Sequence, residues 1–197
     1  MIQIANTDEQ KRIGLIAEYL NAGDRKAAAA EYAYFVKKYS QQVLDFTARM
    51  VSCMADAEEL AQNAFIKAFN KFEKFEQRAS FLTWVSRIAY NESINHLKRR
   101  KLHYVDIDEV PIADCSHLDE EFSTGNEDRI KLMEEAIDIL PPDERMLILL
   151  YYYEDKPLNE IAFIMDAEPN ALAVRLHRIR KKLLITIKQK EYEQNER

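Results

Sequence analysis

Apolar residues recur at steps of three and four along most of this chain, which is the spacing of a helix with one buried face. Such a stripe is formed by Val36, Tyr39, Val43, Phe46, Met50 and Cys53. Two further helices are expected, one with Leu60, Phe65, Phe69 and Phe72, and one with Trp84, Val85, Ile88 and Ala89 toward the core. The pattern therefore predicts an all-α fold.

Residues that favour helix starts divide this pattern into separate helices. Asp24 and Ser80 can each cap the helix that follows, and Asp56 with Glu59 forms a plausible capping box. Pro142 suits the first position of a further helix. We expect helices to begin at these four places.

The helical spacing stops beyond Lys101 and resumes at Ile130. Residues 105–125 are acidic and aperiodic and contain Pro111, as expected of a solvated linker. We predict two small helical domains, joined by a flexible acidic linker and followed by a polar tail. The expected boundaries are residues 1–102, 103–127, 128–190 and 191–197.

The composition narrows the class of protein further. Only three glycines among 197 residues argue against a β-sandwich or barrel, which needs many tight turns. The longest apolar runs are far shorter than the about 20 residues that span a bilayer, and the first residues do not resemble a signal peptide. Cys53 and Cys115 are isolated, as in a reduced protein. We expect a cytoplasmic protein without membrane insertion.

Charge is distributed very unevenly along the chain. The net charge is −6, yet one basic segment ends in Lys98-Arg99-Arg100-Lys101, and another, from Leu172 to Lys190, has no acidic residue. Between them, Tyr104 to Glu135 holds eleven acidic residues against two basic ones, a local charge of −9. Two cationic surfaces in an acidic protein indicate a nucleic-acid partner that the net charge conceals.

The C-terminal basic segment has the pattern of a helix-turn-helix. A short helix over residues 157–165, a tight turn at Asp166-Ala167 and a helix from Pro169 are predicted. One face of the second helix is apolar: Leu172, Leu176, Ile179, Leu183 and Ile187. The opposite face, which suits a major groove, carries Val174, Arg175, His177, Arg178, Lys181 and Lys182. The apolar Val174 could touch a thymine methyl group; alternatively, this face is merely solvated.

A second basic stripe lies on the helix expected after Ser80, at Arg87, Asn91, Ile94 and Lys98. Arginine and asparagine can both hydrogen-bond to bases. Aromatic residues just before the stripe, Phe75, Phe81 and Trp84, could stack unpaired bases or could belong to the core. The buried period favours the core for Phe81 and Trp84.

At this point the motifs themselves indicate a family. Asp56-Ala57-Glu58-Glu59-Leu60-Ala61-Gln62, Ser80-Phe81-Leu82-Thr83-Trp84 and Arg87-Ile88-Ala89-Tyr90-Asn91 resemble the second conserved region of bacterial sigma factors. Leu140-Pro141-Pro142-Asp143-Glu144-Arg145 and Arg175-Leu176-His177-Arg178 resemble the fourth. The chain is most similar to the small extracytoplasmic-function (ECF) group of the sigma-70 family.

The resemblance implies a dissociable subunit of RNA polymerase that directs transcription initiation. Core polymerase would bind, through the clamp helices of its largest subunit, to Asp56, Glu58, Leu60, Gln62 and Phe65. The minus-ten element would be recognised by Gln77, Arg78, Ser80, Arg87, Asn91, Lys98, Arg99 and Arg100, with one base flipped from the melted strand. The minus-35 element would be read by Asn170, Val174, Arg175, His177, Arg178, Lys181 and Lys182.

Further partners are implied in the same way. Residues 137–153 would contact the flap of the second-largest polymerase subunit, and the acidic segment would follow the RNA exit path. An anti-sigma factor is also expected.

Several residues depart from the family pattern. Asn63 replaces an acidic residue, the loop from Phe75 to Ser80 lacks the usual glycine, and Asp166 replaces a turn glycine. Asp tolerates the left-handed conformation that such a turn needs. Ala173 and Val174 stand where polar or basic base-reading residues are common, so minus-35 specificity cannot be transferred.

Two other classes of protein remain as alternatives. A helix-turn-helix regulator would bind DNA directly, usually as a dimer, and a sigma-like interaction protein would assemble without supporting transcription. Catalysis has no support in the sequence, because the histidines are scattered and no glycine-rich phosphate loop occurs. Cys115-Ser116-His117 lacks a second pair of ligands, so we expect no metal, no cofactor and no small-molecule substrate.

Overall fold

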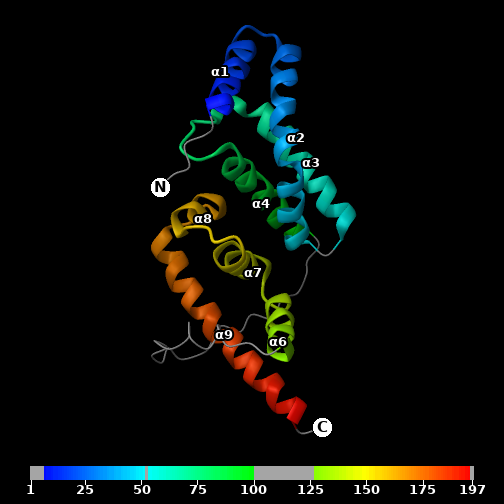
Figure 1. Ribbon diagram of the computed structural model, residues 1–197, viewed down its shortest axis with the longest axis vertical. Coiled ribbons are helices and arrows are strands. Elements are labelled where there is room, and N and C mark those ends of the chain that lie inside the picture. The colour runs from blue at the N-terminus through cyan, green and yellow to red at the C-terminus, as the bar shows by residue number, and fades with distance from the viewer. Residues whose placement is uncertain (1–6, 52, 100–126, 196–197) are drawn as a thin grey trace. The chain divides into compact units, whose positions relative to one another are not determined.

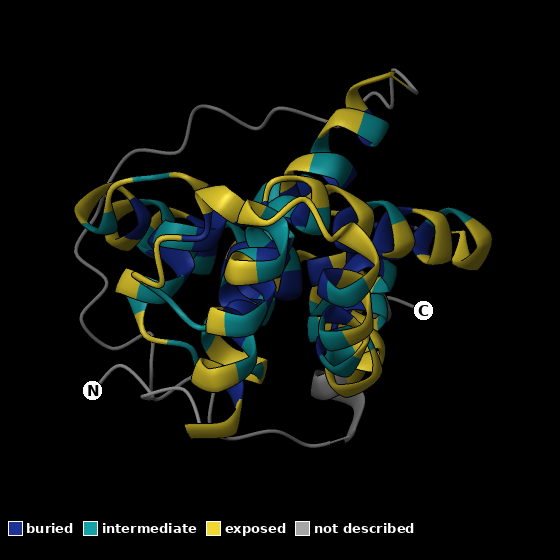
Figure 2. Ribbon diagram, turned by 90° about the horizontal axis from the view of Figure 1, so that it is seen from above, coloured by how far each residue is buried: buried dark blue, intermediate teal, exposed yellow. Residues whose placement is uncertain are grey.

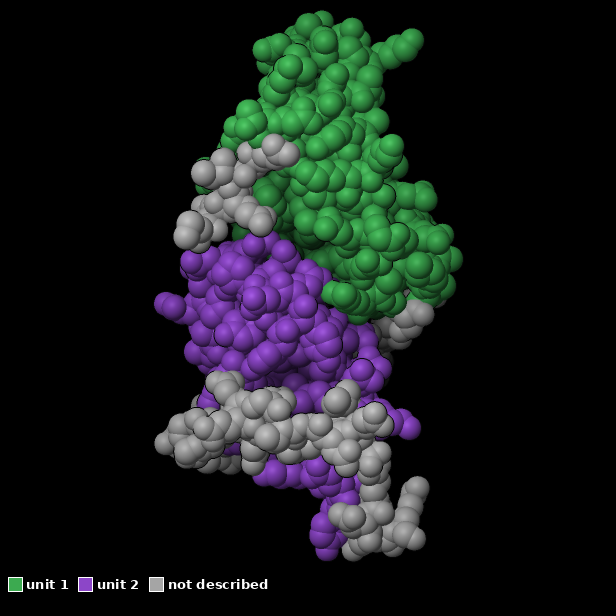
Figure 3. Space-filling model, viewed as in Figure 1, with its two compact units in different colours: residues 1–100, 162–167 green, residues 101–161, 168–197 purple. Residues whose placement is uncertain are grey.

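A computed structural model describes residues 7–51, 53–99 and 127–195, and within these residues every regular element is helical (Figure 1). The prediction of an all-α fold is confirmed. The molecule divides into two units, one of residues 1–100 with 162–167 and one of residues 101–161 with 168–197 (Figure 3). Residues 103–126 of the predicted linker and Arg100 lie outside the described residues, and Glu127, predicted as the last residue of the linker, begins α6.

In the first unit, the long helix α2 packs against every other helix of residues 7–99. The elements are α1 (Thr7–Asn21), α2 (Arg25–Met50), α3 (Met54–Asn70), the short 3₁₀ turn η1 (Phe72–Lys74) and α4 (Phe81–Arg99). Contacts join α2 to α1, α3 and α4, and join α3 to α4. The helices carry buried and exposed residues on different sides, as their sequence periodicity requires (Figure 2).

Two of the predicted caps in this unit are present. The Asp24 carboxylate accepts a hydrogen bond from the backbone N–H of Ala27 at 3.0 Å, at the start of α2. The Ser80 hydroxyl accepts one from the N–H of Thr83 at 3.1 Å, at the start of α4. Both bonds satisfy N–H groups that have no partner within the helix.

The start of α3 differs from the prediction. The helix begins at Met54 after Cys53, so Asp56 lies inside its first turn instead of capping it. A carboxylate there still interacts favourably with the positive end of the helix dipole. Cys53 is exposed and does not continue the buried stripe of α2, because the chain leaves that helix in extended conformation at Val51.

An aromatic cluster forms the core between α2, α3 and α4. The ring of Phe81, at 1% exposure, lies 4.4 Å from Phe35, 5.8 Å from Tyr32 and 6.0 Å from Trp84, between ring centroids. Tyr32 donates a hydrogen bond from its hydroxyl to the carbonyl of Phe65 at 2.9 Å, and burial raises the pKa of this tyrosine. Phe81 is therefore a core residue, whereas Trp84 lies half-buried at the edge.

Helix α1 is held to α2 by a buried carboxylate. Glu9, at 3% exposure, accepts a hydrogen bond from the Tyr39 hydroxyl at 2.6 Å and forms an ion pair with Lys38. Burial, with a smaller contribution from Glu9, raises the pKa of Tyr39 to about 12. A buried charge needs such partners to offset its desolvation.

The second unit is built around one long basic helix. Its elements are α6 (Glu127–Asp138), α7 (Pro142–Ile148), the π-helical turn η2 (Leu149–Tyr153) and α9 (Pro169–Asn195). Between η2 and α9 along the chain lies α8 (Leu158–Met165), whose residues 162–165 are grouped with the first unit. Helix α9 packs against α6 and α7, and all five apolar residues predicted for its inner face are buried. It continues to Asn195, through most of the segment predicted as a tail.

The helix start at Pro142 and the turn after α8 also agree with the prediction. Pro142 occupies the first position of α7. The turn between α8 and α9 places Asp166 at φ 54°, and the N–H of Ala167 donates to the carbonyl of Ala162 at 3.0 Å. Asp166 thus adopts the left-handed conformation for which glycine is usually required.

Replacing Phe81 by alanine tests the aromatic core. We expect Phe81→Ala to lower the free energy of unfolding of the first unit by about 3–5 kcal/mol, because it leaves a cavity among packed rings. Chemical denaturation followed by the fluorescence of Trp84, the single tryptophan of the chain, reports on this unit. Ile66→Ala, at a side chain 57% exposed, is the control and should change the value by less than about 0.5 kcal/mol. Equal losses in the two variants would contradict the assignment of Phe81 to the core.

Candidate polymerase and nucleic-acid interfaces

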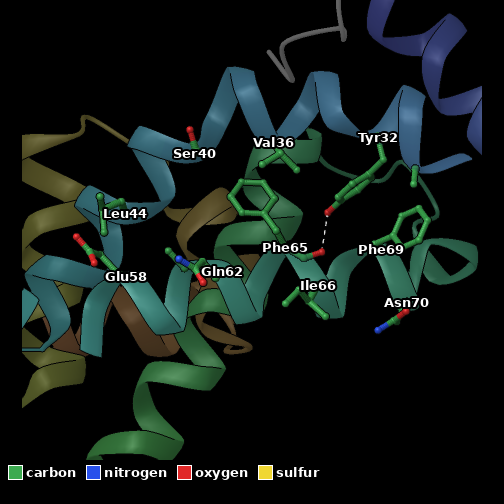
Figure 4. A pocket seen from close by; sticks show the side chains of 12 residues that line it. Tyr32, Val36, Ser40, Leu44, Glu58, Gln62, Phe65, Ile66, Phe69 and Asn70 are labelled. Atoms are coloured by element: carbon green, nitrogen blue, oxygen red, sulfur yellow. Dashed lines mark hydrogen bonds between the residues drawn. The ribbon is translucent and has the colours of Figure 1, made fainter. Parts of the chain in front are cut away.

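A groove of about 540 Å³ runs between α2 and α3 (Figure 4). Three residues of the predicted polymerase-binding set line it, Glu58, Gln62 and Phe65. All three come from α3, and the polar pair Glu58 and Gln62 is exposed on this helix. The groove therefore combines an apolar lining with two polar side chains from one of its helices.

The other side of this groove, on α2, was not predicted from the sequence. Helix α2 contributes Ala29, Tyr32, Val36, Ser40 and Leu44, at steps of three, four, four and four. This second stripe shares Val36 with the stripe predicted to be buried, and its spacing was available as a signal in the sequence. Ile66 of α3 also lines the groove and remains 57% exposed, which makes it the most accessible large apolar side chain there.

Two other residues predicted to bind polymerase have different surroundings. Leu60 is 6% exposed and belongs to the core, so it is not on the surface with Glu58 and Gln62. The Asp56 carboxylate lies half-buried in the first turn of α3, 3.4 Å from Nε2 of His96 on α4. Asn63, which departs from the family pattern, is half-buried one residue beyond Gln62.

The loop before α4 presents polar side chains above the aromatic cluster. Gln77 and Arg78 are exposed, and Gln77 adopts a left-handed backbone conformation at φ 56°. Nε of Arg78 lies 2.6 Å from the Glu76 carboxylate, which partly neutralises it. The Ser80 hydroxyl accepts the capping hydrogen bond at the start of α4, which gives this residue a structural role. The loop can offer a glutamine amide and one arginine to a ligand.

The predicted stripe on α4 runs toward the C-terminal end of this helix. Arg87 is half-buried and Asn91 is exposed in its middle, and Lys98 and Arg99 are exposed at its end. Cations in the last turn interact favourably with the negative end of the helix dipole, so they have a structural reason to be there as well. The same cations give this end a local positive charge that suits phosphate groups.

Helix α9 exposes part of the predicted recognition face. Asn170, Val174 and Arg178 are exposed, Val174 to 53%, and the other four predicted residues are half-buried. An apolar side chain so exposed at a helix surface gains nothing from packing within the chain. The accessible part of this face thus includes one amide, one valine and one guanidinium.

Two cations of this face are paired with carboxylates of α7. The Arg175 guanidinium forms an ion pair with Asp143, and Nζ of Lys182 lies 3.1 Å from Oε1 of Glu144. Asp143 and Glu144 are consecutive residues in the first turn of α7. These carboxylates occupy the donors that a DNA phosphate would use. The charge pattern of the sequence could not predict these two ion pairs, because the paired residues are 32 and 38 positions apart.

A search of the described residues finds no group of three or more side chains that could hold a metal ion. Among the same residues, no helix has the length and apolar content needed to cross a membrane.

An all-α chain that ends in a helix-turn-helix with a basic second helix is typical of transcription proteins. Two family models match the chain: residues 35–103 match sigma-70 region 2, and residues 130–183 match sigma-70, region 4. Together these matches span more than half of the chain. The chain belongs to the sigma-70 family of RNA polymerase sigma factors, in its extracytoplasmic-function group.

Curated relatives agree with this assignment. The RNA polymerase sigma-H factor of Pseudomonas aeruginosa is 29% identical over 180 residues, covering 84% of this chain and 88% of the relative. The ECF RNA polymerase sigma-E factor of Escherichia coli K12 is 29% identical over 181 residues, covering 87% and 92%.

Solved structures share the fold. The sigma factor RpoE from Bartonella quintana, in complex with the anti-sigma factor NepR, matches with a TM-score of 0.56 at 20% identity, over 80% of this chain and 97% of that one. CnrH in complex with the cytosolic domain of CnrY matches with a TM-score of 0.56 at 17% identity, over 90% and 97%.

The left-handed residue of the loop gives a test of local strain. We expect Gln77→Gly to raise the free energy of unfolding by about 1 kcal/mol, because glycine adopts positive φ without the steric cost that a side chain brings. The neighbouring change Glu76→Gly, where φ is not positive, should give no gain. Denaturation followed by Trp84 fluorescence compares the two. A destabilised Gln77→Gly variant would show that the glutamine side chain stabilises the loop by more than its backbone conformation costs.

Proposed function

We propose that this sigma factor binds core RNA polymerase and directs initiation at promoters that carry minus-ten and minus-35 elements. The observation that carries the proposal is that both conserved regions occur in order on one chain, each with an accessible surface. A regulator that binds DNA directly would have no use for the groove and the α4 stripe. In this role the protein would act as a regulator of transcription and not as an enzyme, and it would act in the cytoplasm together with polymerase.

The groove between α2 and α3 is the proposed polymerase-binding surface. Its apolar lining would receive side chains of the clamp helices, while Glu58 and Gln62 would hydrogen-bond at its rim. This division resembles other protein interfaces, in which an apolar centre is surrounded by polar contacts. Ile66 joins the predicted set because it is both exposed and in the groove.

The loop from Phe75 to Ser80 with the α4 stripe is the proposed minus-ten surface. Gln77 and Asn91 are exposed amides, which can bond to the edge of an unpaired base. Lys98 and Arg99 would hold the phosphates of the same strand. Trp84, half-buried at the edge of the aromatic cluster, would offer a partly accessible ring for stacking.

The outer face of α9 is the proposed minus-35 surface, with Arg178 as its main phosphate contact. Val174 would touch the methyl group of a thymine, which is the apolar feature of the major groove. Arg175 and Lys182 contribute less, because Asp143 and Glu144 neutralise them.

These ion pairs and the net charge of −6 reduce the attraction of the free protein to DNA. Phosphate contacts dominate non-specific affinity, so this favours binding only when polymerase holds both surfaces at once.

An anti-sigma factor is the further partner that we propose. Two proteins of the same fold were solved in complexes of this kind, RpoE with an anti-sigma factor and CnrH with the cytosolic domain of CnrY.

In vitro transcription of sheared genomic DNA tests the proposed function directly. Cognate core polymerase is used with and without the protein, and transcript 5′ ends are sequenced. New start sites that share two upstream elements would establish the function and give the promoter sequence. Assembly with polymerase but no new start sites would favour a sigma-like interaction protein, and a DNA-binding dimer that ignores polymerase would favour a conventional regulator.

Ile66→Ser tests the groove as the polymerase-binding surface. Burial of this side chain by a partner is worth about 1–2 kcal/mol, so we expect its loss to weaken core binding roughly tenfold. Titration of labelled protein with core polymerase measures the affinity. Tyr192→Ser, at an exposed apolar residue near the end of α9, is the control and should bind normally. Normal binding by both variants would exclude contact at Ile66.

Arg178→Ala and Arg175→Ala together test the charge pairing on α9. With holoenzyme on a promoter found as above, Arg178→Ala should reduce the slope of log affinity against log salt by about 1, as for one lost phosphate contact. Arg175→Ala should reduce the slope much less, because Asp143 already neutralises this cation. Equal reductions would show that Arg175 leaves Asp143 when DNA binds.

A further inference from the structure

We infer that His96 is a positioning residue, which fixes the Asp56 carboxylate for contact with polymerase. The inference rests on the proposed function, because it takes Asp56 as a polymerase contact. It adds a residue from α4, the helix proposed to bind DNA, to the polymerase-binding surface of α3.

The geometry brings the two side chains together from neighbouring helices. Helices α3 and α4 pack against each other, and Nε2 of His96 lies 3.4 Å from Oδ2 of Asp56. The two side chains are 27% and 22% exposed, so each is mostly withdrawn from solvent. They lie 40 positions apart in the sequence, at the start of α3 and near the end of α4.

The buried nitrogen gives this contact its significance. Nε2 of His96 is inaccessible to solvent and has no hydrogen-bond partner in its present geometry. A buried polar group without a partner is costly, and a carboxylate is the strongest acceptor a side chain can offer. A small side-chain rotation would shorten the 3.4 Å separation between the two groups. With the proton of His96 on Nε2, the Asp56 carboxylate would then accept a hydrogen bond from this nitrogen. The same bond would hold Asp56 in one rotamer.

Holding the two helices together does not depend on this pair. A second ion pair, between Lys67 and Glu92, also joins α3 to α4, and the aromatic core packs beneath both helices. The contact between His96 and Asp56 is therefore not the sole interaction that holds these two helices together. What His96 adds is a defined direction for the Asp56 carboxylate. This carboxylate lies in the first turn of α3, the helix on which Glu58 and Gln62 are exposed to a partner protein.

The position of His96 also relates the two proposed surfaces. It lies two residues before Lys98 on α4, in the turn that carries the exposed cations. A contact that polymerase makes with Asp56 would consequently act on the part of α4 that faces the promoter.

A double-mutant cycle on core-polymerase affinity tests the inference. The variants are His96→Leu, Asp56→Asn and their combination, with His96→Gln as the conservative replacement that keeps an N–H donor near the place of Nε2. We expect His96→Leu to weaken binding by about three- to tenfold in the native background, and to have no further effect beside Asp56→Asn. His96→Gln should restore most of the affinity, which a purely structural role would not require.

Controls separate this inference from folding and from the proposed function. Thermal unfolding of each variant identifies loss of structure, and Asn95→Ala, at an exposed neighbour on α4, should bind normally. An equal loss for His96→Leu in both backgrounds, or no loss in either, would overturn the role of His96 alone. If Asp56→Asn itself binds normally, Asp56 is no polymerase contact, and both that part of the proposed surface and this inference are wrong.

Discussion

The packing of aromatic rings around Phe81 is the constraint on which the first unit depends. The ring lies among residues of α2, η1 and α4, and its removal from solvent fixes where α4 begins. The loop from Phe75 to Ser80 is anchored at both ends by this cluster, since Phe75 packs 4.8 Å from Trp84 between ring centroids. A rigid support of this kind allows a short polar loop to hold a left-handed residue at its tip.

The second unit depends on a different balance, between burial on one face of α9 and charge on the other. Five apolar residues hold the helix against α6 and α7. The carboxylates of α7 then reach Arg175 and Lys182, so the first turn of α7 sets how much positive charge α9 presents. This is a physical reason why a basic helix need not give a protein high affinity for DNA by itself.

The two proposed interfaces in the first unit lie on neighbouring helices. The α2–α3 groove and the α4 stripe are connected through the packing of α3 on α4, and the Asp56–His96 contact is one of the polar links between these helices, with the Lys67–Glu92 ion pair. Because side chains in a packed interface move together, binding at one surface can affect the geometry of the other.

The sequence by itself determined the helices, most of their starts and the family. These follow from local signals: the spacing of apolar residues, the side chains of Asp24 and Ser80, the proline at position 142, and motifs in a fixed order. It did not determine the start of α3, because Asp56 fits a first turn as well as a cap. It favoured the core for both Phe81 and Trp84 over stacking on bases, whereas in the structure Phe81 is buried and Trp84 is half-buried. Only the tertiary structure decided these points, together with the groove, the neutralised cations of α9 and the neighbour of His96. Each depends on residues that are distant in the sequence and meet only when the helices pack.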